Sequence, residues 1–238
     1  MSENGFEDAR RETVRYHREL YASASLGQPG TWLAGPSGLL DDVLVHVRKD
    51  RPLVAYDLGA GIGRHTIPML RLLPKGSEVV AVDLLPEALR RLEASVPEGV
   101  RTTLRTVAAD LLDFEFDRPA DLVLAFSAIE HLPDVSAIRR LLDRIARATA
   151  GGGAIAIGVV ADRAERTDDG ARRPALLESQ VTSTTAQRAL SEAFAGFDVQ
   201  ESSLTPTRVR EARGNESYWL ESTLVRFIAT KPVSMTRG

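Results

Sequence analysis

The 238-residue chain contains no cysteine, few aromatic residues and little excess charge of either sign. The lack of cysteine excludes disulfides, thiolate metal ligands and a cysteine nucleophile. The net charge is only −3, so no strong basic field attracts nucleic acid or an anionic membrane. No apolar run reaches the ~18 residues of a membrane span, and the beginning, MSENGFEDARRE, is too polar for a signal peptide. We expect a cytoplasmic protein that binds neither nucleic acid nor membrane.

The middle of the chain alternates short apolar runs with amphipathic segments. Buried parallel strands are predicted at 53–58, 78–83, 104–110, 121–126 and 154–160. Helices are predicted between them at 64–73, 86–95 and 134–150. Two later runs, 197–204 and 218–231, leave no room for a helix between them and predict an antiparallel pair at the sheet edge. This order favours a doubly wound α/β fold.

The chain divides into a cap, one α/β domain and a short tail. Residues 1–50 have helical spacing on both sides of a break rich in Gly and Pro, and we interpret them as an N-terminal helical cap. Residues 51–232 form the α/β domain, and 233–238 the tail. A polar insertion at about 161–183 is either a solvated or a substrate-facing loop. Residues 205–217 are expected to form another loop.

The stretch AYDLGAGIGRH, residues 55–65, places three glycines at alternate positions between a predicted strand and a predicted helix. Glycine lets a backbone approach a ligand closely, and ligands of open parallel sheets lie outside the carboxyl ends of the strands. The stretch lacks the Lys and Ser/Thr of an NTPase phosphate loop, and its spacing is not the dinucleotide pattern G-x-G-x-x-G. Asp57 also stands where it would repel a pyrophosphate. The pattern favours a ligand with a cationic amino-acid end and a nucleoside end.

The segment DLGAGIG, residues 57–63, resembles the first motif of class I S-adenosylmethionine (SAM)-dependent methyltransferases. Three further blocks match the family in order: VVAVD ending at Asp83, AADLLDF around Asp110, and DLVLAFSAIEHLPD at 121–134. The resemblance implies a Rossmann-like, seven-stranded doubly wound sheet whose last strand is antiparallel. It also implies SAM as the cofactor and S-adenosylhomocysteine as its product.

The ends of the chain resemble the tellurite-resistance-type methyltransferases and their small-molecule relatives. The likeness rests on W-L-x-x-P at 32–36 ahead of the core, and on FDVQESS and STLVRFIATKP in the tail. The His-Arg pair and the later Arg of that subgroup are not matched here. Glu211, Ala212 and Arg213 stand near the pair and Trp219 near the later Arg. Tellurite is therefore not predicted as the acceptor.

The resemblance also implies which residues hold the cofactor. The predicted set is Asp57, Gly59, Gly61, Gly63, Arg64, Asp83, Leu84, Asp110, Leu111 and Ser127. Asp83 would accept from the ribose hydroxyls, and Asp110 from the adenine amino group. Asp57 would meet the ammonium of the cofactor, or would only cap the turn that follows. Arg64 would pair with the carboxylate of the cofactor.

Four residues are candidates for the acceptor side of the site. An ordinary histidine has a pKa of about 6.5. His131, the only histidine expected near the chemistry, could therefore take a proton, or could only pack the cofactor pocket. Tyr16, Tyr21 and Trp32 of the cap form a predicted lid, and each either faces the sulfonium or packs on the core. No His and carboxylate pattern has metal-ligand spacing, so no metal is predicted.

The predicted reaction is SAM-dependent methyl transfer to a small-molecule acceptor by a monomer or homodimer. Two alternatives stay open: intramolecular cyclisation of SAM to a cyclic imino acid with release of methylthioadenosine, and a non-catalytic SAM-binding protein. An NAD-dependent oxidoreductase is disfavoured by the glycine spacing and by the lack of a Tyr-x-x-x-Lys pair. We expect the cap, the 161–183 insertion and residues 205–217 to recognise the acceptor.

Overall fold

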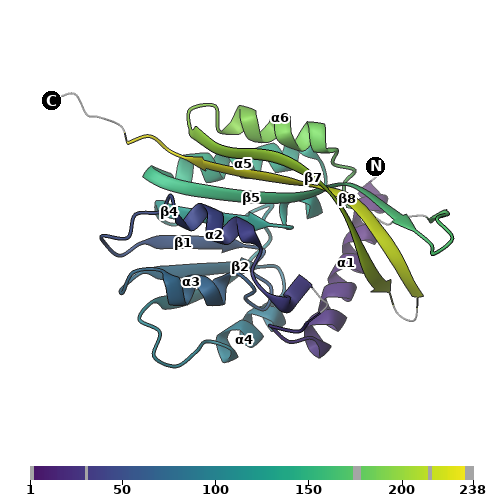
Figure 1. The fold of residues 1–238 in the computed structure, drawn as a ribbon, viewed down its shortest axis with the longest axis horizontal. Helices are drawn as coiled ribbons and strands as arrows, with labels where there is room; N and C mark the ends of the chain where they lie inside the picture. Colours follow the sequence, from purple (N-terminus) through teal and green to yellow (C-terminus); the bar gives the residue numbers. More distant parts are fainter. Residues whose placement is uncertain (1–2, 30–31, 174–177, 214–215, 234–238) are drawn as a thin grey trace.

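The centre of the molecule is one mixed β-sheet (Figure 1). The structure, a computed structural model, describes residues 3–29, 32–173, 178–213 and 216–233. The strands are β1 (Val54–Leu58), β2 (Glu78–Asp83), β3 (Thr103–Ala108), β4 (Ala120–Phe126), β5 (Thr149–Arg166), β6 (Arg172–Arg173), β7 (Asp198–Arg213) and β8 (Glu216–Thr230). Their order is β3-β2-β1-β4-β5-β8-β7, and β6 pairs with β5 beside this path. The pairs among β1 to β5 are parallel, whereas β8 runs antiparallel to both β5 and β7.

Helices cover both faces of the sheet. They are α1 (Glu3–Ser23), α2 (Gly38–Leu44), α3 (Thr66–Leu72), α4 (Pro86–Ala94), α5 (Val135–Ala148) and α6 (Ser183–Ala193), with short 3-10 turns η1 (Trp32–Ala34) and η2 (Ile129–His131). Alternate strand residues enter two cores: Tyr56 packs with α5 and α6, and its neighbour Ala55 with α2, α3 and α4. This two-sided burial explains why the central strands are almost continuously apolar. Within the described residues, no helix has the length and apolarity to cross a membrane.

The outer parts of β5, β7 and β8 continue past the layered body as a three-stranded extension, here called the arm (161–166, 205–213 and 216–224) (Figure 1). Helix α1 lies alongside the arm, where the Tyr16 hydroxyl donates to Glu211 Oε2 at 2.8 Å. A small cluster that includes Tyr21 and Leu33 ties α1 and η1 to the layered body. The arm and α1 therefore flank the space beyond the carboxyl ends of the parallel strands from two sides.

The predicted doubly wound sheet with an antiparallel last strand is confirmed, and β2 has the predicted bounds. The expected loop at 205–217 is wrong, because β7 runs to residue 213 and β8 begins at 216. The 161–183 insertion is likewise largely ordered, since β5 continues to residue 166 and pairs with β8. Helix α6 was not predicted, although Thr182 caps it by accepting from Thr185 N. Residues 174–177, 214–215 and 234–238 lie outside the described part of the chain.

Candidate functional site

The glycine loop after β1 lies where the strand order reverses, because β2 and β4 flank β1 on opposite sides. Gly59 has a φ of +78°, and a methyl group there would lie 2.6 Å from Ala128 Cβ. Gly63 has a φ of +98°, and its methyl group would lie 2.4 Å from Leu92 Cδ1. Both positions therefore require glycine, the first for close approach to the turn after β4 and the second for packing against α4.

Asp83, at the carboxyl end of β2, is held in one orientation by two backbone groups. Gly61 N donates to its Oδ2 at 2.7 Å and Leu85 N to its Oδ1 at 2.9 Å. Burial raises the pKa of Asp83, and the two N–H groups oppose that rise. Each carboxylate oxygen keeps a lone pair free beyond these bonds. This arrangement presents a fixed acceptor pair, which suits the two hydroxyls of a ribose.

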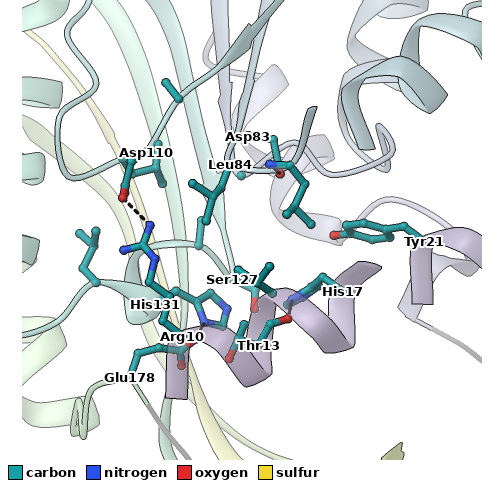
Figure 2. Close-up of a pocket in the computed structure, with 17 residues that line it drawn as sticks. Arg10, Thr13, His17, Tyr21, Asp83, Leu84, Asp110, Ser127, His131 and Glu178 are labelled. Atoms are coloured by element: carbon teal, nitrogen blue, oxygen red, sulfur yellow. Dashed lines mark hydrogen bonds and ion pairs between the residues drawn. The ribbon is translucent and has the colours of Figure 1, made fainter. Parts of the chain in front are cut away.

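Asp83 lines a cavity of about 130 Å³ beyond β2 and β3, here called the smaller cavity (Figure 2). Leu84 and Leu111 line it as well, and so does Asp110, whose Oδ1 accepts from Leu112 N at 2.9 Å. Arg10 of α1 pairs with the other carboxylate oxygen of Asp110. Carboxylates can accept hydrogen bonds from a nucleoside, and the neighbouring apolar side chains can pack against its base. These residues therefore fit the adenosine part of SAM.

Three of the predicted cofactor residues, Asp57, Gly61 and Gly63, line neither cavity. Asp57 is 1 % exposed and accepts from the Thr66 hydroxyl at 2.6 Å, which joins it to the start of α3. Burial raises the pKa of Asp57 to about 7, although the Thr66 bond opposes the rise. The contact of Asp57 with an ammonium stays a prediction.

A second cavity of about 370 Å³, here called the larger cavity, lies between α1, the glycine loop and the arm. Arm side chains that line it include Val209 and Glu211 on β7, and Tyr218 and Leu220 on β8. The cap, the 161–183 insertion and residues 205–217, which we expect to recognise the acceptor, all contribute lining residues to this cavity. The two cavities share six lining residues: Thr13, His17, Tyr21, Gly59, Ser127 and His131.

Three acids, two of them buried, meet the larger cavity from three elements. Glu130 of η2 is 1 % exposed, and its Oε1 accepts from Ser127 Oγ at 2.9 Å and from Val160 N at 3.2 Å. Glu165 of the arm pairs with Arg173 at 3.2 Å. Burial raises the pKa of the Glu211 carboxyl, and the hydrogen bond from Tyr16 opposes this. These acids give the cavity polar anchors among apolar walls.

Two further predicted residues lie where the cavities meet the strand ends. Ser127 has a positive φ of 51°, which a non-glycine residue seldom adopts and which is common at functional sites. Arg64 lines the larger cavity, donates from Nε to Gly35 O at 2.6 Å, and has its pKa lowered by burial. Both lie on loops that follow adjacent parallel strands, β4 and β1.

His131 stands at the junction of the cavities, with its Nδ1 3.2 Å from Glu178 Oε1 (Figure 2). Burial would raise the pKa of Glu178, but the hydrogen bond from His131, and its charge when the ring is protonated, hold the pKa at about 2. The ring of His17 lies 5.9 Å from that of His131. His131 is therefore not the only histidine at the site: His17 lines both cavities and His65 the larger one.

The predicted lid residues divide between the two cavities. Tyr16 lines the larger cavity and Tyr21 lines both, with its hydroxyl beside Gly61. The side chain of Trp32 lies outside the described part of the structure. Arg10 and Glu178 were missed, because each reaches the site from a segment with no motif. Over the described ranges, no three His, Asp or Glu side chains gather closely enough to hold a metal ion.

Residues 55–153 match the family model of a methyltransferase domain. The match covers this segment alone, which is less than half of the chain. This is the segment that carries the glycine loop, Asp83, Asp110 and His131. Two solved structures with a similar fold contain bound SAM or S-adenosylhomocysteine. No curated protein sequence gives a significant match to the chain.

Solved structures share the fold of this chain at low sequence identity. TehB from Haemophilus influenzae is 18 % identical with a TM-score of 0.60, over 81 % of this chain and 61 % of that one. The magnesium protoporphyrin IX methyltransferase of Synechocystis PCC 6803, with bound SAM, is 13 % identical with a TM-score of 0.58, over 95 % and 97 % of the chains. The 1,6-didemethyltoxoflavin-N1-methyltransferase of Burkholderia thailandensis is 21 % identical with a TM-score of 0.58, over 98 % and 91 %.

Proposed function

We propose that the protein transfers the sulfonium methyl group of SAM to a small-molecule acceptor held in the larger cavity. The observation that carries this proposal is the pair of adjoining cavities with six common lining residues. Asp83 and Asp110, the two acids that suit a nucleoside, line the smaller cavity. The larger cavity adjoins it on the side of the arm. A methyl donor and an acceptor would meet where the two cavities join.

The size and lining of the larger cavity support a small molecule as the acceptor. Its volume of about 370 Å³ falls in the range of about 300–1,000 Å³ for small-ligand pockets. Apolar side chains such as Val209 and Leu220 surround a few charged ones, as in small-ligand sites. The Burkholderia thailandensis relative binds 1,6-didemethyltoxoflavin, a small acceptor, together with S-adenosylhomocysteine.

The larger cavity also favours transfer over cyclisation of SAM. A reaction within the cofactor needs no second chamber, whereas this chain builds one from three strands of the arm and from α1. Likewise, a protein that only binds SAM needs no second cavity with buried acids beside it.

SAM, when bound, supplies the electrophilic methyl group. The residues of this chain would bind, orient and exclude water, and these effects can account for much of a methyl transfer. Arg10 holds α1 against Asp110, and Tyr16 holds it against Glu211, so α1 covers both cavities. We propose His131, which lines both, as the group that accepts a proton from the acceptor.

The test is incubation of the protein with methyl-labelled SAM, with and without fractionated small metabolites. We expect S-adenosylhomocysteine and label in a small molecule only when the acceptor fraction is present. Methylthioadenosine without any acceptor would instead establish cyclisation. Binding of SAM with no product from any fraction would support a non-catalytic role.

A matched pair of β7 variants ties the activity to the larger cavity. Val209→Trp would fill it, and we expect loss of transfer with unchanged SAM affinity. Leu204→Trp is the control, because Leu204 is 45 % exposed against 44 % for Val209 and lines neither cavity. Equal activity of the two variants would contradict the proposed acceptor site.

A further inference from the structure

Glu178 is a buried carboxylate that is not among the residues expected to bind the cofactor. It is 1 % exposed and lies between the arm and α6, 47 positions after His131 in the sequence. The next residue, Ser179, donates from its hydroxyl to Glu130 O at 2.9 Å. This bond fixes the segment of Glu178 against η2, the turn that carries His131. The two side chains are thus held together by backbone as well as by their own contact.

We propose that Glu178 is a positioning residue: it holds His131 as the Nδ1–H tautomer, so that Nε2 accepts the proton of an acceptor O–H or ring N–H. The inference rests on the proposed methyl transfer and adds the chemical class of the acceptor. A carboxylate has no proton to donate when ionised, so the His131 Nδ1 at 3.2 Å must be the donor. In the neutral ring, the lone pair then belongs to Nε2.

The charged groups around His131 favour its use as a proton acceptor. Glu178 faces it from the segment before α6, Asp83 from the end of β2, and Arg10 and His17 from α1. Burial, assisted by His131, lowers the pKa of His17 to about 4, so His17 is neutral near pH 7. The ionised Glu178 carboxylate stabilises the positive ring that proton uptake creates, as the aspartate does in a serine-protease triad.

The step balances without any further reagent. A lone pair on the acceptor oxygen or nitrogen forms the bond to the methyl carbon, and the carbon–sulfur bond breaks with its electron pair left on sulfur. The acceptor proton passes to His131 Nε2 and leaves to water when the product is released. An acceptor without such a proton, such as a thioether or tertiary amine, would gain nothing from this pair. The group methylated would therefore carry a transferable proton, as a phenol-like hydroxyl or a heterocyclic N–H does.

The first test uses the protein without cofactor or acceptor. The chain has four histidines, so ¹⁵N NMR of the imidazoles, with His131→Gln for assignment, reads the tautomer of His131 directly. We expect Nδ1–H in the wild type and a shift toward Nε2–H in Glu178→Gln. An Nε2–H tautomer in the wild type would overturn the proposal, even if the variant failed to fold.

The second test uses the acceptor found with labelled SAM. In Glu178→Gln we expect kcat to fall about 10- to 100-fold, because the variant loses only part of the roughly 10²- to 10⁴-fold contribution of general-base catalysis. We also expect the pH profile of kcat to change, while KM and SAM affinity stay the same. Glu115→Gln is the control, since the Glu115 side chain is 76 % exposed and lines neither cavity. An unchanged kcat in Glu178→Gln would refute the positioning role. The predicted tautomer in a protein that transfers no methyl would refute the proposed function alone.

Discussion

We expect Asp83→Asn to weaken the binding of SAM more than any other single substitution in the smaller cavity. The native carboxylate accepts from Gly61 N at 2.7 Å and from Leu85 N at 2.9 Å, and Asp83 lines the smaller cavity. Asparagine keeps one acceptor oxygen and places an amide NH₂ at the other position. That NH₂ cannot accept from a ribose hydroxyl, and it opposes one of the two backbone donors.

The size of the effect follows from the charge of the lost acceptor. A hydrogen bond to a charged group contributes about 1.5–3 kcal/mol, and about 1.4 kcal/mol corresponds to a tenfold change in Kd. We therefore expect the Kd for SAM to rise about 10- to 150-fold. The fold should survive, because burial already raises the pKa of Asp83 and a neutral side chain relieves that penalty.

Isothermal titration calorimetry with SAM and with S-adenosylhomocysteine measures this change. The control is Asp113→Asn, an exposed aspartate three positions beyond Asp110 that lines neither cavity. Equal loss for both ligands would agree with a contact to the shared ribose. An unchanged Kd in a folded Asp83→Asn protein would refute the assignment of Asp83 to the cofactor.

Three further predictions concern stability. Asp57 has a folded pKa of about 7, above its ordinary value, so the folded state loses stability as pH rises from about 4 to 7. Asp57→Asn should therefore raise the free energy of unfolding at pH 8 by about 4 kcal/mol, and a lower Tm at pH 8 would contradict this. His65 has a pKa lowered to about 3 by burial, so the unfolded chain takes up its proton first and stability falls as pH drops below 6.5. Between pH 6.5 and 5, urea unfolding should show the wild type losing about 2 kcal/mol more than His65→Gln, and parallel losses would refute this. Gly63→Ala should cost about 2–4 kcal/mol in urea unfolding, because its methyl group meets Leu92 at 2.4 Å. Gly99→Ala, with a φ of +76° but no neighbour within 4 Å, should cost only about 1–2 kcal/mol, and equal losses would rule out the steric cause.

The parallel core and the strand-end acids could be predicted because each depends on local pattern. A strand buried on both faces is apolar throughout, so an acid at its carboxyl end, such as Asp83, stands out. The arm could not be predicted in the same way. Its β7 portion has one face on the larger cavity and one in solvent, and it contains Pro206 and several arginines. Those residues are more typical of a loop than of a strand.

The contact between His131 and Glu178 could not be predicted from sequence motifs. His131 lies in a segment that resembles a family motif, whereas Glu178 follows a polar stretch and has no pattern of its own. Only the packing of residues 178–179, between the arm and α6, onto η2 brings them within 3.2 Å. Helix α6 is a different case, because Thr182 followed by the buried Ala186, Ala189 and Leu190 carries a readable helical signal.

The structure of the protein with S-adenosylhomocysteine bound tests the central claim most directly. The account predicts the ribose hydroxyls on Asp83, the adenine beside Asp110, and the sulfur at the junction lined by Ser127 and His131, facing the larger cavity. A sulfur atom that faces away from the larger cavity, or a nucleoside bound elsewhere, would contradict both the cofactor site and the proposed place of methyl transfer.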